Sequence, residues 1–240
     1  MKIGVFTDVH ANLAALEAVL AELAAQGCTE YICMGDVIGI GPQPDEVAVR
    51  LAGMKNLTCV WGNHDMYFVR GLSYPLPDGM GEDEAAHHAW AHARLSEKAK
   101  HFLRSLPGRV CIEREGVRIS AGHYAAGYED GDRRYYPNPA PEDLACMFAS
   151  LDADVFLFGH DHAPVQAEKG GRLYANPGSL GCPHRAGAIA RAGVLEVAEG
   201  KSAFRRLEIP YDLSATTRLI RKYAYPAMEE ILTIFFGESI

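Results

Sequence analysis

The sequence has little cysteine and no long apolar run. Its 240 residues include six cysteines, none of them in a C-x-x-C pair. A chain of this length builds its own hydrophobic core, so no disulfide framework is expected, and we interpret the cysteines as reduced in a cytoplasmic protein. No apolar run approaches the roughly 20 residues of a membrane span, and the apolar stretch after Lys2 is too short for a signal peptide. We therefore expect a soluble protein without a membrane partner.

Positive charge is also scarce. The chain has 23 Lys and Arg against 31 Asp and Glu, which gives a formal net charge of −8, and no segment is rich in basic residues. Non-specific binding to nucleic acid requires a basic surface, so no stable nucleic-acid complex is expected. An anionic substrate would need local positive charge, supplied by a metal ion or by a few arginines.

Short apolar runs alternate with helical patterns in the first quarter of the chain. The runs 2–7, 31–35 and 57–62 are predicted strands, and helical patterns at 12–27 and 44–54 lie between them. This order predicts parallel strands covered by helices. Further along we predict a long helix at 83–106, a hairpin around residues 115–116, a helix at 141–150, a strand at 154–158 and short strands near 164–168 and 171–176. The fold class is therefore a mixed α/β fold.

No repeat, low-complexity segment or linker divides the chain. We expect one domain over residues 1–240, with a sheet-forming core at 1–210 and a helical tail at 212–240. The tail is amphipathic and contains Pro226, which is able to kink a helix. We favour packing of the tail on its own domain over a contact between two copies, which would make a homo-oligomer.

Residues that bind metals or transfer protons follow each predicted buried strand. They are Asp8, His10, Asp36, Asn63, His64, Asp65, His123, His160, Asp161 and His162. The carboxyl ends of strands in an open α/β sheet gather at one edge, where ligands bind, so these residues are expected to converge. A glycine directly precedes four of the five groups. A side chain at those positions would crowd a ligand bound where the groups converge. The glycines are Gly35, Gly62, Gly122 and Gly159.

The spacing of these residues indicates a metal site. Asp8 with His10, and His160 with His162, are i, i+2 pairs whose side chains share one face of extended backbone. Without a counter-ion the carboxylates would repel each other and the buried imidazoles would lack partners. Two carboxylates, one amide and four imidazoles exceed the needs of one tetrahedral ion. They suit two ions that share a bridging carboxylate, and they favour Mn, Fe, Zn, Co or Ni over a soft metal.

Four other histidines lie on the predicted long helix. We interpret His87, His88, His92 and His101 as a partly solvated helix face, because no strand precedes them.

Six short motifs carry a resemblance to a known family. "TDVHAN", "MGDVIGIGPQP", "WGNHD", "AGHY", "FGHDHAP" and "NPGSLG" resemble the calcineurin-like metallophosphoesterases, and most of all the small bacterial phosphodiesterase-type members. The motifs extend from residue 7 to about 185, roughly three quarters of the chain. The resemblance implies a four-layer α-β-β-α sandwich of two mixed sheets, with a dinuclear metal site at one edge.

The resemblance also implies a role for each motif residue. Asp8, His10 and His162 would hold the first metal, and Asn63, His123 and His160 the second. Asp36 would bridge both metals. His64 would be the non-ligand histidine beside the scissile phosphate, with Asp65 orienting or polarising it. Tyr124 and Asp161 depart from the usual fourth and fifth motifs; we expect Tyr124 to line the pocket and Asp161 to face away from the metals.

The function predicted from this site is metal-dependent phosphoester hydrolysis. We favour a phosphodiesterase that acts on small anionic or nucleotide-type phosphate esters through a hydroxide between two divalent metals, with manganese the favoured ion. A dinucleoside-polyphosphate hydrolase and a phosphomonoesterase remain open alternatives. A catalytically silent scaffold is disfavoured, because all seven ligand positions and His64 are present. Arg185 is either a phosphate contact or part of a structural salt bridge.

Overall fold

The computed structural model describes residues 1–73, 75–77, 80–131, 134–136, 138–183 and 187–238. Its regular elements, in chain order, are β1 (Lys2–Phe6), α1 (Leu13–Ala25), β2 (Glu30–Cys33), α2 (Pro44–Ala52), β3 (Leu57–Cys59), α3 (Asn63–Arg70), α4 (Glu82–His92), α5 (Glu97–Ser105), β4 (Arg109–Arg114), β5 (Val117–Gly122), η1 (Tyr128–Asp130), α6 (Pro141–Met147), β6 (Val155–Leu157), β7 (Val165–Lys169), β8 (Arg172–Asn176), β9 (Ile189–Ala198), β10 (Lys201–Pro210), α7 (Leu213–Tyr223) and α8 (Met228–Phe236). Among the described residues, none of these helices combines the length and the apolar character that a bilayer crossing requires.

The strands form two five-stranded sheets, and each sheet is mixed. The first has the order β10-β9-β1-β2-β3, in which β1, β2 and β3 are parallel while β9 and β10 are antiparallel. The second has the order β4-β5-β6-β8-β7, with β5, β6 and β8 parallel and the outer strands antiparallel. The predicted mixed α/β fold is confirmed.

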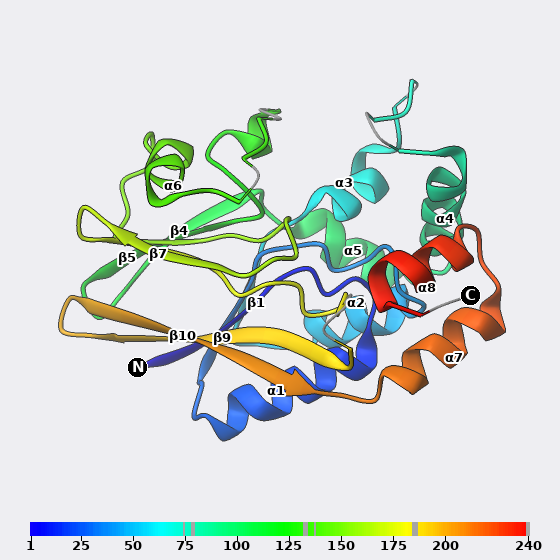
Figure 1. The fold of residues 1–240 in the computed structure, drawn as a ribbon, viewed down its shortest axis with the longest axis horizontal. Helices are drawn as coiled ribbons and strands as arrows, with labels where there is room; N and C mark the ends of the chain where they lie inside the picture. The colour runs from blue at the N-terminus through cyan, green and yellow to red at the C-terminus, as the bar shows by residue number, and fades with distance from the viewer. Residues whose placement is uncertain (74, 78–79, 132–133, 137, 184–186, 239–240) are drawn as a thin grey trace.

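Side-chain alternation along the strands builds the layers. In β6, Val155 and Leu157 belong to the cluster between the sheets, where they meet Ile3 and Val5 of β1. Phe156, between them in sequence, faces the opposite way and packs with Leu144 and Met147 of α6 and with Phe148, which caps that helix. Helix α1 covers the outer face of the first sheet through Leu16, Val19, Leu20 and Leu23. In Figure 1, α6 lies above the pair of sheets and α1 below it, so the four-layer α-β-β-α sandwich is confirmed.

The predicted long helix at 83–106 is wrong in one respect, because it is two helices. Helix α4 ends at His92, and α5 starts at Glu97. Ser96 has extended backbone, and its hydroxyl accepts a hydrogen bond from the amide of Ala99. A serine in this position is a favoured N-cap, so a new helix begins there and α4 turns away from α5.

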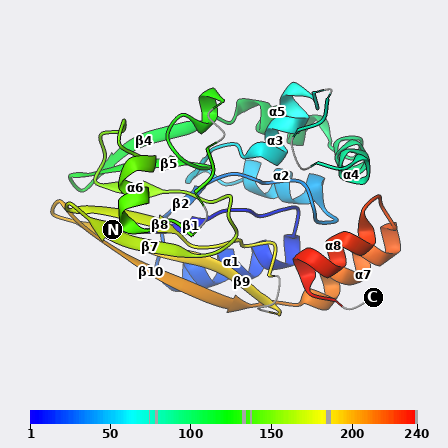
Figure 2. The ribbon, with the colours of Figure 1, turned by 45° about the horizontal axis from the view of Figure 1, so that its top comes forward.

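The tail is also two helices, and it packs on its own chain. Helices α7 and α8 are separated around Pro226, where proline removes a helical hydrogen bond. Tyr225, between the helices, is buried, and its hydroxyl donates to the carbonyl of Ile40 at 2.8 Å. Figure 2 shows α7 and α8 at the same end of the molecule as α4. The tail thus lies beside the loops that follow the parallel strands, where α8 lines a cavity.

Candidate metal centre

The strand ends bring all seven predicted ligand residues together. Loops after β1, β2 and β3 of the first sheet, and after β5 and β6 of the second, reach the same edge of the sandwich. Backbone hydrogen bonds fix these loops to one another, for example from the amide of Asp8 to the carbonyl of Gly35 at 3.0 Å and from the amide of His10 to the carbonyl of Asp36 at 2.9 Å. The side chains therefore converge because the parallel strands end together.

Asp8, His10 and His162 form the first cluster of predicted metal ligands, which we call the first donor group. The Nε2 atoms of His10 and His162 are 2.9 Å apart. Oδ1 of Asp8 lies 3.8 Å from Nε2 of His10 and 3.7 Å from Nε2 of His162. The other oxygen of Asp8 accepts a hydrogen bond from the amide of His160 at 3.1 Å, which holds the carboxylate in place. Three donor atoms thus face a common point.

Asn63, His123 and His160 form the second donor group. Oδ1 of Asn63 lies 3.1 Å from Nε2 of His123 and 3.1 Å from Nδ1 of His160. The two imidazole nitrogens are 3.3 Å apart. Nδ1 of His123 donates to the carbonyl of Met34 at 2.7 Å. This bond fixes the tautomer and leaves the lone pair of Nε2 facing the centre.

Asp36 lies between the two donor groups. Its Oδ2 is 3.8 Å from Nε2 of His10 in the first group and 3.4 Å from Nε2 of His123 in the second. Its Oδ1 accepts a hydrogen bond from the amide of His64 at 2.9 Å. One carboxylate oxygen is therefore anchored to the backbone, and the other faces both groups.

Strained backbone is concentrated at this centre. Five of the seven predicted ligands have φ in the left-handed region, namely Asp8 (52°), His10 (46°), Asp36 (51°), His160 (77°) and His162 (55°). Such a conformation costs roughly 1–3 kcal/mol in a residue other than glycine. The tertiary structure maintains the strain, and its concentration at one place is typical of functional sites.

Two of the four glycines before the donor residues leave room for carboxylates. A Cβ atom added to Gly62 would lie 2.0 Å from Oδ1 of Asp36, and one added to Gly159 would lie 2.7 Å from Oδ2 of Asp8. Gly122 differs from the prediction, because its Cβ would meet the guanidinium of Arg109 at 2.5 Å rather than the centre. Any side chain at Gly62 or Gly159 would displace a donor.

Electrostatics at the centre favour a cation. Burial lowers the pKa of His10 well below its usual value, and burial with the neighbouring His123 lowers that of His160 to about 3, so both rings present lone pairs. Burial alone would lower the pKa of His123, yet the Asp36 carboxylate raises it to about 10. The carboxylates thus require positive charge between the rings, and a proton or a metal ion can supply it.

The donor atoms fit divalent cations. Oδ1 of Asp8 is fully buried and has no hydrogen-bond partner among the described residues. Such an atom would cost about 1–3 kcal/mol if it stayed unpaired. Donors bound to one ion at about 2.0–2.2 Å lie roughly 3–3.5 Å from one another, which is near the spacings in both groups. Imidazole nitrogen with carboxylate and amide oxygen is a ligand set for first-row divalent metals.

His64 faces the centre, but Asp65 does not accompany it. Nε2 of His64 lies 3.9 Å from Oδ2 of Asp36. The carboxylate of Asp65 instead accepts hydrogen bonds from the backbone amides of Gly62, Val37 and Ile38, at 2.9, 3.0 and 3.2 Å. The structure therefore does not support the interpretation of Asp65 as the partner of His64. Asp65 ties the loop after β2 to the start of α3, which positions Asp36 and His64 together.

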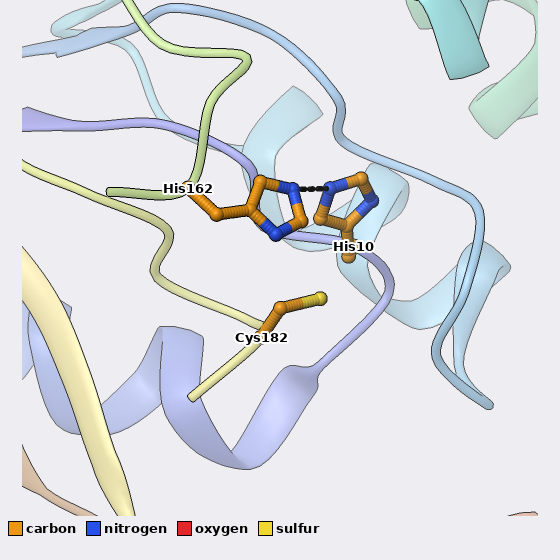
Figure 3. Close-up of side chains that lie close together, drawn as sticks. All are labelled: His10, His162 and Cys182. Atoms are coloured by element: carbon orange, nitrogen blue, oxygen red, sulfur yellow. Dashed lines mark hydrogen bonds between the residues drawn. The ribbon is translucent and has the colours of Figure 1, made fainter. Parts of the chain in front are cut away.

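Cys182 is a residue that the sequence reasoning missed. Figure 3 shows its sulfur beside the facing rings of His10 and His162. The side chain is buried, and burial raises the pKa of the thiol well above its usual value. Cys182 directly follows the "NPGSLG" turn. The turn packs on the loop after β1, because the Ser179 hydroxyl donates a hydrogen bond to the carbonyl of Asp8. This position in the sequence was the only signal that could have placed Cys182 near the site.

The histidines of α4 were predicted to be partly solvated, and for two of them this is wrong. His87 and His88 are 2% and 0% exposed. The ring of His88 lies 5.0 Å from that of His64, centroid to centroid. The ring of His87 lies 4.7 Å from that of Tyr225 in the tail. The tail helices bury this face of α4, and a local helical pattern carries no information about them.

The two predicted substrate-binding residues differ in outcome. Tyr124 is 1% exposed, and its ring lies 4.9 Å from that of His160, so it stands next to the centre as expected. Its hydroxyl accepts a hydrogen bond from the amide of Tyr136 at 3.1 Å. Arg185 lies outside the described residues.

Two cavities open on the centre. The first has a volume of about 840 Å³ and is walled by α4, α8 and the donor loops. The second has a volume of about 730 Å³ and lies over α3 and the loop after β5. Asn63, Tyr135 and His160 line both. The second donor group therefore lies where the two cavities meet.

Known proteins share this sequence pattern and fold. The chain is 29% identical over 246 residues to the uncharacterized protein MJ0912 of Methanocaldococcus jannaschii, covering 93% of each chain. It is 25% identical over 205 residues to the phosphodiesterase YfcE of Escherichia coli K12, covering 82% of this chain and 88% of that one. The crystal structure of a metallophosphoesterase from Sphaerobacter thermophilus matches with a TM-score of 0.76 at 23% identity, over 99% of both chains, which shows a common fold.

A family model decides the assignment. The calcineurin-like phosphoesterase superfamily domain matches residues 1–200, which include both sheets' donor loops. The match covers the greater part of the chain and all seven donors described above. The protein therefore belongs to the calcineurin-like phosphoesterase superfamily and is a metal-dependent phosphoric ester hydrolase.

Proposed function

We propose that the protein binds two divalent cations, manganese being favoured, and hydrolyses small phosphodiesters. Asp8, His10 and His162 would hold one cation, Asn63, His123 and His160 the other, and Oδ2 of Asp36 would bind both. The short distances within each group and the place of Asp36 between them support this assignment.

The meeting of two cavities at the second donor group carries the choice of a diester. A diester has a substituent on each side of its phosphorus, whereas a monoester has only one. With the phosphorus at the junction near Asn63 and His160, each substituent would have a cavity of its own. A site for a monoester needs one cavity, so the second one favours the diester.

The linings of the cavities differ in chemistry. The second cavity contains aromatic side chains and two arginines, from Trp61, Tyr67, Arg70, Tyr124, Tyr128, Arg134 and Tyr135. Aromatic rings and guanidinium groups suit a planar or anionic substituent. The first cavity contains carboxylates and the apolar side chains of Ile231, Ile234 and Phe235 from α8. The two substituents would therefore be unlike, as in an ester that joins a nucleotide to a partly apolar alcohol.

The similarity to YfcE is consistent with this choice. That relative is named a phosphodiesterase, and the match covers most of both chains. At 25% identity it supports the reaction class, and the cavities described above carry the inference about the ester.

The chain's own residues would orient the ester and stabilise the leaving group. When bound, the divalent cations would supply an ionised water as nucleophile and neutralise charge on the phosphoryl oxygens. His64 is 13% exposed and turns Nε2 toward the centre, so it would donate a hydrogen bond or a proton to the leaving oxygen. Asp65 binds the amides of Gly62 and Val37, which ties the start of α3 to the loop after β2 but does not contact the ring of His64.

A substrate pair and one variant test the proposal. We expect manganese-loaded protein to hydrolyse bis-p-nitrophenyl phosphate faster than p-nitrophenyl phosphate. His64→Ala should keep the two cations held by the seven ligands and lose roughly 10²–10⁴-fold in kcat, the usual contribution of a general acid. Faster hydrolysis of the monoester would overturn the choice of a diester. Loss of either of these two cations in His64→Ala would overturn the role given to His64.

A further inference from the structure

A second cluster of possible metal ligands lies beside the dinuclear centre. Glu84 and His88 of α4 and His64 of α3 each place one ligand atom within 4.8 Å of the others. Glu84 and His88 are four residues apart and therefore share one face of α4. Oε1 of Glu84 lies 3.8 Å from Nε2 of His88.

Three of the four ring nitrogens in this cluster are buried without a hydrogen-bond partner in the described part of the chain. His88 is completely buried, and both of its ring nitrogens lack a hydrogen-bond partner among the described residues. Nδ1 of His64 is buried and unpartnered in the same way. Each such atom costs about 1–3 kcal/mol if nothing satisfies it. Both imidazoles line the first cavity, from which a small ligand can reach them.

The chemistry of the cluster is that of a cation site. Two imidazole nitrogens and one carboxylate oxygen are the His₂Glu set found in catalytic zinc sites, which keep a further position open. Donors around one tetrahedral ion lie roughly 3.3–3.5 Å apart, so closure would need a movement of about 1 Å. The side chain of Glu84 is 43% exposed and can supply that movement, because little packs against it.

We propose that His64, Glu84 and His88 bind a third divalent cation. His64 also belongs to a cluster with His10 and Asp36, so the third position would adjoin the first donor group. Cations at neighbouring positions repel one another, and the third would therefore bind more weakly than the two in the centre. Carboxylates in the same cavity offset part of this repulsion; they belong to Glu82, Asp83, Asp161 and Glu230.

The third cation would also fix the orientation of His64. An imidazole has two nitrogens, so binding a cation through one leaves the other free to face the ester. A ligand on one ring nitrogen determines which nitrogen carries the proton. In this arrangement α4 supplies a support for His64 that Asp65 does not provide.

Metal counting tests the proposal without reference to catalysis. Protein stripped of metal is equilibrated with rising Zn²⁺, and bound zinc is measured by elemental analysis after dialysis. We expect three equivalents per chain in the wild type, the third leaving first on dilution. Glu84→Gln and His88→Phe should saturate at two. Glu84→Gln changes a half-exposed side chain, so its zinc content tests the proposal even if His88→Phe fails to fold.

Two matched variants serve as controls. Asp83→Asn removes the adjacent carboxylate of the same cavity, and His87→Phe removes the adjacent buried imidazole; both should still saturate at three. Equal numbers of equivalents in the wild type and in Glu84→Gln would overturn the proposal. A wild type that saturates at two with Glu84→Gln at one would support the new site and contradict the two-cation centre instead. Loss of the third equivalent in Asp83→Asn would show that general negative charge, rather than this cluster, holds the ion. Because no turnover is measured, these outcomes are independent of the proposed phosphodiesterase activity.

Discussion

Two histidines after β6, His160 and His162, line the same cavity as two histidines of α4, but strand-end and α4 histidines are held in different ways. His10, His160 and His162 have left-handed backbone in loops that both sheets fix. His87 and His88 lie on a regular helix that packs against the tail through Trp90 and the buried Tyr225. The two sheets fix the positions of the strand-end histidines, whereas one helix and its contacts with the tail fix the positions of the α4 histidines. The site formed by the seven predicted ligands should therefore be rigid, and helix α4 should respond to changes in the tail.

Removal of the shared carboxylate gives the largest expected effect on the centre. Asp36→Asn keeps the shape of the side chain but removes the charge that faces both donor groups. We predict loss of bound metal and a fall in kcat of at least about 10³-fold, since removal of one preorganised electrostatic group alone costs 10²–10³. Elemental analysis and a diester assay measure both. Asp161→Asn is the matched control and should retain metal; equal metal loss in the two variants would contradict the role given to Asp36.

A pair of glycine substitutions compares the packing of the two regions. Gly62→Ala would bring Cβ to 2.0 Å from Oδ1 of Asp36, whereas Gly81→Ala at the start of α4 meets nothing within 4 Å. We predict that Gly62→Ala lowers the free energy of unfolding by about 1–3 kcal/mol, as overpacking usually does, and weakens metal binding. Gly81→Ala should cost under about 1 kcal/mol. Denaturant unfolding of metal-free protein measures both, and similar costs would show that the centre is no more tightly packed than α4.

The smallest expected effect comes from the tail. Tyr225→Phe removes the buried hydroxyl that donates to the carbonyl of Ile40 at 2.8 Å. We predict a loss of about 0.5–1.5 kcal/mol in the free energy of unfolding, with two tightly bound metals retained. A drop in the content of these two metals would mean that the tail supports the metal site as well as helix α4.

The sequence was sufficient to locate the strands, although β3 ends at Cys59 rather than at residue 62. Alternating and continuous apolar runs are local signals, and Asp8, Asp36 and His123 follow directly from them. The break between α4 and α5 was missed, although Ser96 is a recognisable cap within a long helical pattern. The predicted exposure of the α4 histidines was wrong because the residues that bury them are distant in sequence. His87 is buried by Tyr225, more than 130 residues away.

The partners of Asp65 were missed for a similar reason. A motif shows which residues are neighbours along the chain, and Asp65 follows His64 directly. The structure shows that its carboxylate turns to the amides of Val37 and Ile38 in a different loop. Side-chain direction at the first turn of α3 depends on how that loop packs, which a motif does not encode.

Anomalous scattering from crystals grown with stoichiometric manganese and no chelator tests the central claim most directly. We predict two peaks roughly 3.5–4 Å apart, the usual separation in two-metal sites. One should lie among Asp8, His10 and His162 and the other among Asn63, His123 and His160, with Asp36 between them. A single peak, or donor groups without any anomalous density, would contradict the proposed dinuclear site.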